Sequence, residues 1–247
     1  MKRATLLACL FVVCAAGLAG TVLAQDQQTA QDQQTAQPRS RYINGVPFFM
    51  VIPRGDSQRA LAEAFAGTNI TMWSSSFTYQ NVTYPFTMIG TNPAAGSATT
   101  DVPVVIIPLK FNFARGVSLS AESTVCGDSE TALQRTQASP ILQAAAFSPG
   151  GTNVGTTQYI DAFQRGNFWN SVSTSSPNYH VLLSAVTVEP LQTISVSKRN
   201  GTTVAGPCAR IGEVDINFFD SKAQSLLTTL GIPATSFPIF LDYNTFL

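Results

Sequence analysis

The segment Val102–Phe113 constrains the fold of this chain more than any other part of the sequence, because it is the most apolar strand candidate. A continuous apolar run of this length is typical of a strand that is buried on both faces, which places it at the centre of a sheet. Pro103 and Pro108 interrupt the pattern, because each removes a backbone donor from the ladder. We therefore expect a central strand that is bulged or bent at Pro108.

The N-terminus has the features of a secretory signal peptide. A basic pair, Lys2 and Arg3, precedes the apolar run Ala4–Leu18, and the small residues Val22 and Ala24 occupy the −3 and −1 positions of a cleavage site. The run is too short for a stable membrane span. We predict cleavage after Ala24 and a mature protein that is secreted or periplasmic, without membrane association. An uncut N-terminal anchor is the alternative.

The charge of the mature chain excludes two classes of partner. Removal of residues 1–24 from the 247-residue chain leaves 223 residues, enough for one domain with a substantial core. Lys2 and Arg3 leave with the signal, so the 14 basic side chains fall to 12 against 14 acidic ones, a net charge of −2. Nucleic acid binding needs clustered basic residues, which this sequence does not have. The sequence also contains no basic amphipathic stretch for an anionic membrane.

Cysteine usage predicts one disulfide. Two of the four cysteines, Cys9 and Cys14, lie within the signal, where Cys9 also has the local context of a lipoprotein processing site. Cys126 and Cys208 remain in the exported chain and are expected to pair. Closing a loop of that length stabilises a fold by about 3–5 kcal/mol. Two buried free thiols are the alternative.

Three segments are expected along the chain: the signal at residues 1–24, a tether at residues 25–41 and a domain at residues 42–247. The tether begins with the hexapeptide Gln-Asp-Gln-Gln-Thr-Ala repeated in tandem, a composition that builds no core and predicts flexibility. The domain is expected to be single and globular. The segment Phe237–Leu241 has the pattern of a core strand close to Leu247, so a domain truncated at its C-terminal end is one interpretation.

The hydrophobic periodicity changes repeatedly between that of strands and that of helices. Strands are expected over Ile70–Tyr79, Val82–Gly90, Val102–Phe113, Val181–Val188, Thr193–Lys198, Ile211–Phe218 and Phe237–Leu241. Helices are expected over Gln58–Ala66, Glu130–Gln137, Pro140–Phe147, Gln158–Arg165 and Ser221–Leu230. Tight turns are expected at Gln80-Asn81 and Asn200-Gly201. Because no regular βαβ repeat appears, we predict an α+β fold with a mixed, mainly antiparallel sheet, several short helices and one disulfide.

The whole chain has one histidine, His180. A single histidine excludes the catalytic sites that need two or more. A zinc site built from two or three histidines is impossible within these residues, and no nucleophile motif or phosphate-binding loop is complete. His180 is interpreted as a structural or surface histidine, with a role in a Ser–His–acid triad as the alternative. We therefore expect no metal and no cofactor, and we assign no catalytic residue.

Glu213 and Asp215 form the remaining candidate polar site. They are two residues apart on an expected strand, which places both on one face. Such a pair is suited to calcium binding or to acid–base chemistry, although a solvated strand face is the more frequent arrangement. Aromatic residues at Phe168, Trp169 and Tyr179 fit a core better than a sugar-binding surface.

Two segments, Thr124–Leu133 and Tyr159–Trp169, resemble a group of uncharacterised secreted proteins of soil bacteria. The resemblance covers residues 80–247. Longer members of that group continue into a His-Glu helix similar to that of zinc metallopeptidases, and this sequence has no such helix. Two functions are therefore expected: an exported, non-catalytic binding or structural domain, or the N-terminal part of a secreted zinc-dependent hydrolase whose catalytic helix lies beyond Leu247. The sequence names no partner and no oligomeric state.

Overall fold

The computed structural model describes residues 41–43, 46–48, 69–124 and 127–247. The predicted signal peptide, residues 25–40 of the tether, the helix expected over Gln58–Ala66 and Cys126 lie outside these residues. The described residues contain helices and strands in several sheets, which confirms the predicted α+β class. Cys208 is disulfide-bonded. Its pairing with Cys126 stays a prediction.

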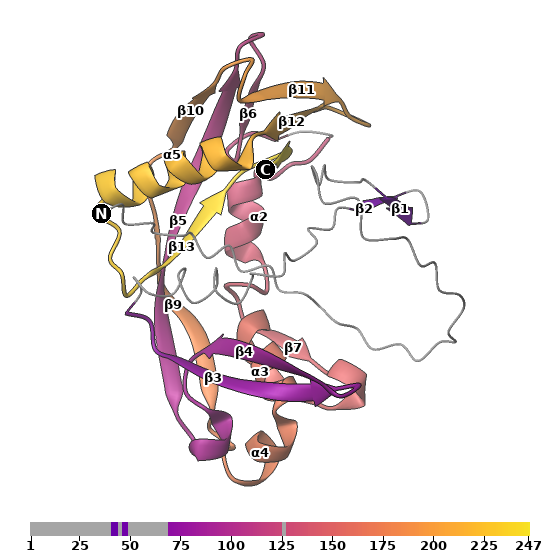
Figure 1. The fold of residues 1–247 in the computed structure, drawn as a ribbon, viewed down its shortest axis with the longest axis vertical. Coiled ribbons are helices and arrows are strands. Elements are labelled where there is room, and N and C mark those ends of the chain that lie inside the picture. The colour runs from indigo at the N-terminus through magenta and orange to yellow at the C-terminus, as the bar shows by residue number, and fades with distance from the viewer. Residues whose placement is uncertain (1–40, 44–45, 49–68, 125–126) are drawn as a thin grey trace.

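A single long strand, β5 (Thr99–Phe113), forms the axis of the molecule (Figure 1). Its 15 residues extend over roughly 50 Å at about 3.3 Å per residue. β9 (His180–Val188) and then β10 (Gln192–Val196) run parallel to it along one edge. Along the other edge β13 (Phe237–Leu241) is parallel and β6 (Ser118–Ser120) is antiparallel. The predicted central strand is therefore confirmed.

The direction of these strands corrects the prediction of a mainly antiparallel sheet. Three of the four ladders that β5 forms in the described residues are parallel. The chain reaches β9 through the helices α3 (Tyr159–Asn167) and α4 (Trp169–Thr174), and it reaches β13 after α5 (Ile216–Thr229). Crossover connections of this kind return the chain in the same direction, whereas a tight turn reverses it.

Pro108 lies where no neighbouring strand needs its missing N–H. Glu189 N donates to Ile106 O at 2.8 Å, so even-numbered residues of β5 direct their backbone groups toward β9 and β10. Pro108 therefore faces the gap between these two strands, where the ladder stops and then resumes. The register with β9 shifts earlier, between Pro103 and Val105. The irregularity predicted at Pro108 thus lies in the neighbouring strands, and β5 itself is continuous there.

β5 contributes to two hydrophobic cores on opposite faces of the sheet, because successive side chains of a strand point to opposite sides. Odd-numbered positions of its middle and C-terminal part pack under α5: Val105, Ile107, Leu109, Phe111 and Phe113. Even-numbered positions of its N-terminal part, Val102, Val104 and Ile106, pack against Tyr179 and Val181 on the other face. The apolar run is continuous because the two cores overlap near the middle of the strand.

The remaining described elements are smaller sheets, one helix and two turns. They are the hairpin β3 (Met72–Tyr79) and β4 (Val82–Ile89), the pair β1 (Arg41–Ile43) and β2 (Val46–Phe48), the pair β7 (Ala145–Phe147) and β8 (Gly155–Thr157), the sheet of β11 (Gly201–Ala205), β12 (Arg210–Val214) and β14 (Thr245–Phe246), the helix α2 (Ala132–Ala138), and the 3-10 turns η1 (Pro93–Ala95) and η2 (Pro149–Gly151). In Figure 1, α5 crosses the upper half of β5, whereas α3, α4 and the β3–β4 hairpin lie at its lower half.

Three local predictions are wrong, each because of its context. The helix expected over Pro140–Phe147 is absent: residues 140–142 form a turn and residues 145–147 form β7, whose pairing with β8 overrides the helical propensity of the segment. The strand expected over Ile211–Phe218 ends before Asp215, which caps α5. The hairpin turn expected at Asn200-Gly201 is a connection instead, because β11 starts there and pairs with β12 beyond residues 206–209.

Candidate functional site

The helix α3 covers the outer edge of β9 with side chains in place of a further strand. Gln158, directly before α3, accepts from Leu183 N at 2.6 Å and donates to Leu183 O at 2.8 Å. The Asp161 carboxylate accepts from Val181 N at 2.8 Å through Oδ1. These side chains satisfy backbone groups that would otherwise be exposed at a sheet edge.

Arg165 continues the same series one turn further along α3, where its guanidinium donates to Tyr179 O at 2.6 Å. The spacing explains why one helix face matches one strand edge. Positions three and four apart share a helix face, and alternate strand residues direct their backbone groups the same way. The matched positions are 158, 161 and 165 on the helix side and 183, 181 and 179 on the strand.

Asp161 also holds the imidazole of His180. Its Oδ2 accepts from Thr157 Oγ1 at 2.7 Å and lies 2.9 Å from His180 Nδ1. Asp161 is fully buried, whereas the His180 side chain is 34% exposed. A buried carboxylate that orients an exposed imidazole through Nδ1 is also the way catalytic acid–histidine pairs are built.

A Ser–His–acid triad at His180 needs a third group, a nucleophilic hydroxyl or thiol. Within the described residues, Asp161 is the only side chain that hydrogen-bonds the His180 ring. The main-chain N–H of His180 donates to Ala98 O, directly before β5, at 2.9 Å. The backbone of His180 is therefore part of the pairing between β9 and β5. Packing of α3 on β9 explains the position of His180, and within the described residues no nucleophilic side chain is hydrogen-bonded to its ring to complete a triad.

Tyr179 belongs to the core and not to a sugar-binding surface. It is fully buried, and its hydroxyl donates to Gln164 Oε1 at 2.8 Å. Gln164 in turn donates to Ile89 O at 3.0 Å, which ties the network to the end of β4. Burial, and next the charge of Asp161, raise the pKa of Tyr179 to about 12. The phenol therefore stays neutral and serves as a buried donor.

The structure separates the carboxylates of Glu213 and Asp215. Glu213 is exposed on β12, where it pairs with Thr202 of β11. Asp215 is the N-cap of α5, and its Oδ1 accepts from Phe218 N at 2.8 Å. The prediction that both carboxylates share a strand face fails because the strand ends between them. Asp215 is thereby committed to helix capping.

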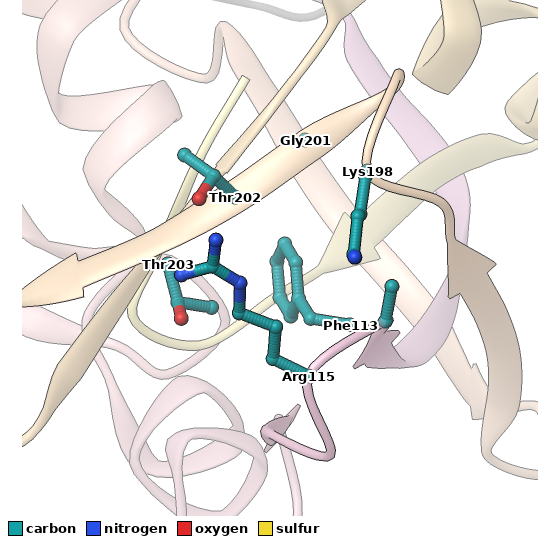
Figure 2. A pocket seen from close by; sticks show the side chains of 7 residues that line it. Phe113, Arg115, Lys198, Gly201, Thr202 and Thr203 are labelled. Carbon is teal, nitrogen blue, oxygen red and sulfur yellow. The ribbon is translucent and has the colours of Figure 1, made fainter.

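A shallow basic pocket lies between the end of β5 and the start of β11. Figure 2 shows Arg115 and Lys198 on either side of the Phe113 ring, with Thr202 and Thr203 of β11 beside them. The pocket volume is about 100 Å³, whereas small-molecule sites usually measure about 300–1,000 Å³. The pocket therefore has room for a few atoms only. Among the described residues, no group of three or more His, Cys, Asp or Glu is placed to hold a metal ion.

A group of exposed apolar side chains lies at the end of the β3–β4 hairpin. The predicted turn at Gln80-Asn81 is confirmed, with φ of 48° and 62°, as a two-residue hairpin turn requires. Four large apolar side chains flank this turn on one face of the hairpin, and we call them the aromatic tip. They are Phe77, Tyr79, Val82 and Tyr84, which are 54%, 60%, 50% and 43% exposed.

The aromatic tip continues into the body of the molecule through further rings on the same face. Phe77 and Tyr84 stack with centroids 5.3 Å apart and an interplanar angle of 22°. The ring centroid of Phe86 lies 6.4 Å from that of Phe77 and 6.2 Å from that of Phe168, which precedes α4. The ring centroids of Trp73 and Phe168 are 5.1 Å apart. The base of the hairpin is thus anchored on the α3–α4 junction, while its tip is free among the described residues.

The opposite face of the hairpin carries hydroxyl groups. Ser74 and Thr87 are hydrogen-bonded across the strands at 2.8 Å, as are Thr78 and Thr83 at 3.2 Å. The hairpin therefore has one aromatic and one polar face. The aromatic tip was not among the predicted sites, although its signal is present in the sequence: residues 69–90 contain no charged residue, and large apolar residues alternate along both strands.

The interpretation of the site rests on its geometry, because comparison with known proteins gives no match. No family model, no curated protein and no solved structure matches the chain. Within the described part of the chain, each helix is too short or too polar to traverse a bilayer.

Proposed function

We propose that this is an exported, non-catalytic binding protein that contacts a partner protein through the aromatic tip. The exposure of four large apolar side chains on one face of a single hairpin carries the proposal. Side chains of this kind offer on the order of 400 Å² of apolar surface when half exposed. The largest apolar patch of a monomeric protein measures about 300–600 Å² and is often functional.

The chemistry of the hairpin suits an uncharged partner surface. Residues 69–90 contain no charged side chain, so affinity at this surface comes from burial of rings and from hydroxyl and amide groups. Tyrosine, serine and asparagine are the residues that adaptable binding surfaces use most. The tip combines Tyr79 and Tyr84 with the amides of Gln80 and Asn81 at the turn.

The geometry of the rings in the aromatic tip favours a protein as the partner over a polysaccharide. A sugar ring stacks on an open aromatic face, but Phe77 and Tyr84 cover one another at 5.3 Å and stand nearly parallel. Each ring of the pair therefore has one face covered by the other, and their exposed parts suit insertion into an apolar pocket of a partner protein.

Photocrosslinking from the tip tests this proposal. A photoreactive phenylalanine analogue at position 79 is expected to give one discrete, saturable adduct with a protein of the exported fraction of the producing organism. The same analogue at Thr83, on the hydroxyl face, is the matched control and is expected to give none. The double variant Val82→Ser/Tyr84→Ser is expected to reduce the adduct from position 79 at least tenfold, because it removes two side chains of the tip.

Equal labelling from positions 79 and 83, or an adduct that the double variant does not reduce, would contradict the proposed function. Both variant sites are exposed, so their effect on folding is expected to be small. Thermal unfolding of each variant checks this before crosslinking.

Three further proposals complete this function. The chain is exported after cleavage following Ala24, on the strength of its N-terminal pattern. Cys126 is the disulfide partner of Cys208, because it is the only other cysteine of the mature chain. The kinship with secreted soil-bacterial proteins rests on the two segments that resemble them. The alternative function, the N-terminal part of a zinc-dependent hydrolase, stays a prediction.

A further inference from the structure

We infer that the outer edge of β3 pairs with the same edge of a second copy of this chain. The two hairpins would then form one four-stranded antiparallel sheet with a doubled aromatic face. The inference concerns the edge of the hairpin and its hydrogen bonds, whereas the proposed function concerns its aromatic face. The two are therefore separable by experiment.

The hydrogen-bond pattern of the hairpin shows which backbone groups of β3 are free. Gly90 N donates to Thr71 O at 2.8 Å, so odd-numbered residues of β3 direct their N–H and C=O groups inward, to β4. Even-numbered residues direct theirs outward, because the two directions alternate along an antiparallel pair. Ser74, Ser76 and Thr78 are exposed, and within the described residues no strand pairs with this edge.

The outer edge of β4 is closed to the same kind of pairing. Pro85 lies opposite Ser76 in a pair of the outward-directed type, so the edge lacks a donor at that point. Ile89 O, also outward-directed, accepts from Gln164 Nε2 at 3.0 Å. One edge of the hairpin is thus protected at two points and the other is open. Assembly through the open edge closes at two copies and does not extend into a fibre.

The β3 edge fits a second copy because it is its own complement. An antiparallel pair placed about a two-fold axis at Ser75 joins Ser74 to Ser76 of the second copy, and Ser76 to Ser74, through matched donors and acceptors. Trp73 then lies opposite Phe77 of the second copy, an aromatic cross-strand pair. The small Ser75 side chains meet at the axis, where strands approach most closely.

Charge also favours this self-pairing. Like charges opposite one another destabilise a strand pair, and edge strands commonly carry lysine for that purpose. Residues 69–90 contain no charge, so two copies of the edge do not repel one another. An edge of this length buries less than the roughly 1,600 Å² of a standard interface, and we therefore expect a dimer with a dissociation constant in the micromolar range.

Sedimentation equilibrium of the mature protein from about 1 µM to 1 mM tests the inference with two matched proline variants. Ser76→Pro removes an outward N–H from β3 and leaves the ladder to β4 intact. Thr87→Pro makes the same change at an outward position of β4. The expected result is a reversible dimer for the wild type and for Thr87→Pro, with a dissociation constant at least tenfold higher for Ser76→Pro.

A wild-type chain that stays monomeric at 1 mM would overturn the inference, as would a Ser76→Pro variant that dimerises like Thr87→Pro. If Ser76→Pro fails to fold, Ser75→Lys at this exposed position places two like charges directly opposite one another at the axis and carries the same expectation. Amide exchange gives a second readout, because the amides of Ser74, Ser76 and Thr78 should become protected as concentration rises. The Val82→Ser/Tyr84→Ser variant changes only β4 and is expected to dimerise normally, which separates failure of this inference from failure of the proposed function.

Discussion

Asp242 is the carboxyl whose ionisation is coupled most clearly to folding. It follows β13 and is partly buried, and this burial raises its pKa from 3.8 to about 6, although a hydrogen bond from the Thr245 backbone opposes the shift. A raised pKa means that the folded chain holds this proton more tightly than the unfolded chain does. The stabilising contribution is complete below pH 3.8 and is lost as the pH rises to about 6.

Replacement of Asp242 by asparagine removes this pH dependence, because the amide does not ionise and still offers an oxygen to Thr245. Asp242→Asn is expected to raise the free energy of unfolding by on the order of 1–3 kcal/mol at pH 7.5 and to change it little at pH 3.5. Urea unfolding at the two pH values measures the difference. The exposed Asp101→Asn serves as the control, and an equal effect of Asp242→Asn at both pH values would contradict the assignment.

At the scale of elements, the contact between α3 and β9 shows how a helix substitutes for a strand. The Asp161 carboxylate receives hydrogen bonds from the Val181 backbone and the Thr157 hydroxyl, and it also contacts His180 Nδ1. Its removal leaves buried donors without partners, and each of these costs about 1–3 kcal/mol. The His180 ring is partly exposed and is not needed for the other two bonds.

The two residues of this pair should therefore differ sharply in their effect on stability. Asp161→Ala is expected to lower the free energy of unfolding by about 3–5 kcal/mol, and His180→Ala by less than about 1 kcal/mol. Chemical denaturation of both variants under the same conditions measures the difference. Similar losses for the two would mean that the imidazole carries the edge contact as much as the carboxylate does.

Elements with strong local chemistry could be predicted from the sequence, and elements defined by distant partners could not. The turn at Gln80-Asn81 is indicated by Asn81, a residue type that tolerates positive φ. The end of β12 was missed because alternation from Ile211 onward outweighed the capping signal of Asp215. The link between Asp161 and His180 was out of reach, since nothing local indicates that α3 would lie along the outer edge of β9.

For the whole molecule, the sequence predicted a central strand correctly, whereas the direction of the strands beside it was predicted incorrectly. The apolar run of Val102–Phe113 indicates burial but contains no record of which strands pair with it or in which direction. The candidate site shows the same limit. Its rings could be read from the segment 69–90, but their exposure depends on how the hairpin extends beyond the α3–α4 junction.

Because β5 passes through both cores, the two halves of the molecule should unfold together. Phe219 of α5 is buried in one core, 6.1 Å from the Phe111 ring, whereas both tryptophans, Trp73 and Trp169, belong to the other half. Phe219→Ala is expected to destabilise the fold by about 3–5 kcal/mol. A shared strand transmits that loss, so the midpoint seen by tryptophan fluorescence should fall together with the midpoint seen by far-ultraviolet circular dichroism. An unchanged fluorescence midpoint beside a lowered dichroism midpoint would show that the halves unfold separately, and that β5 joins two cores without coupling them.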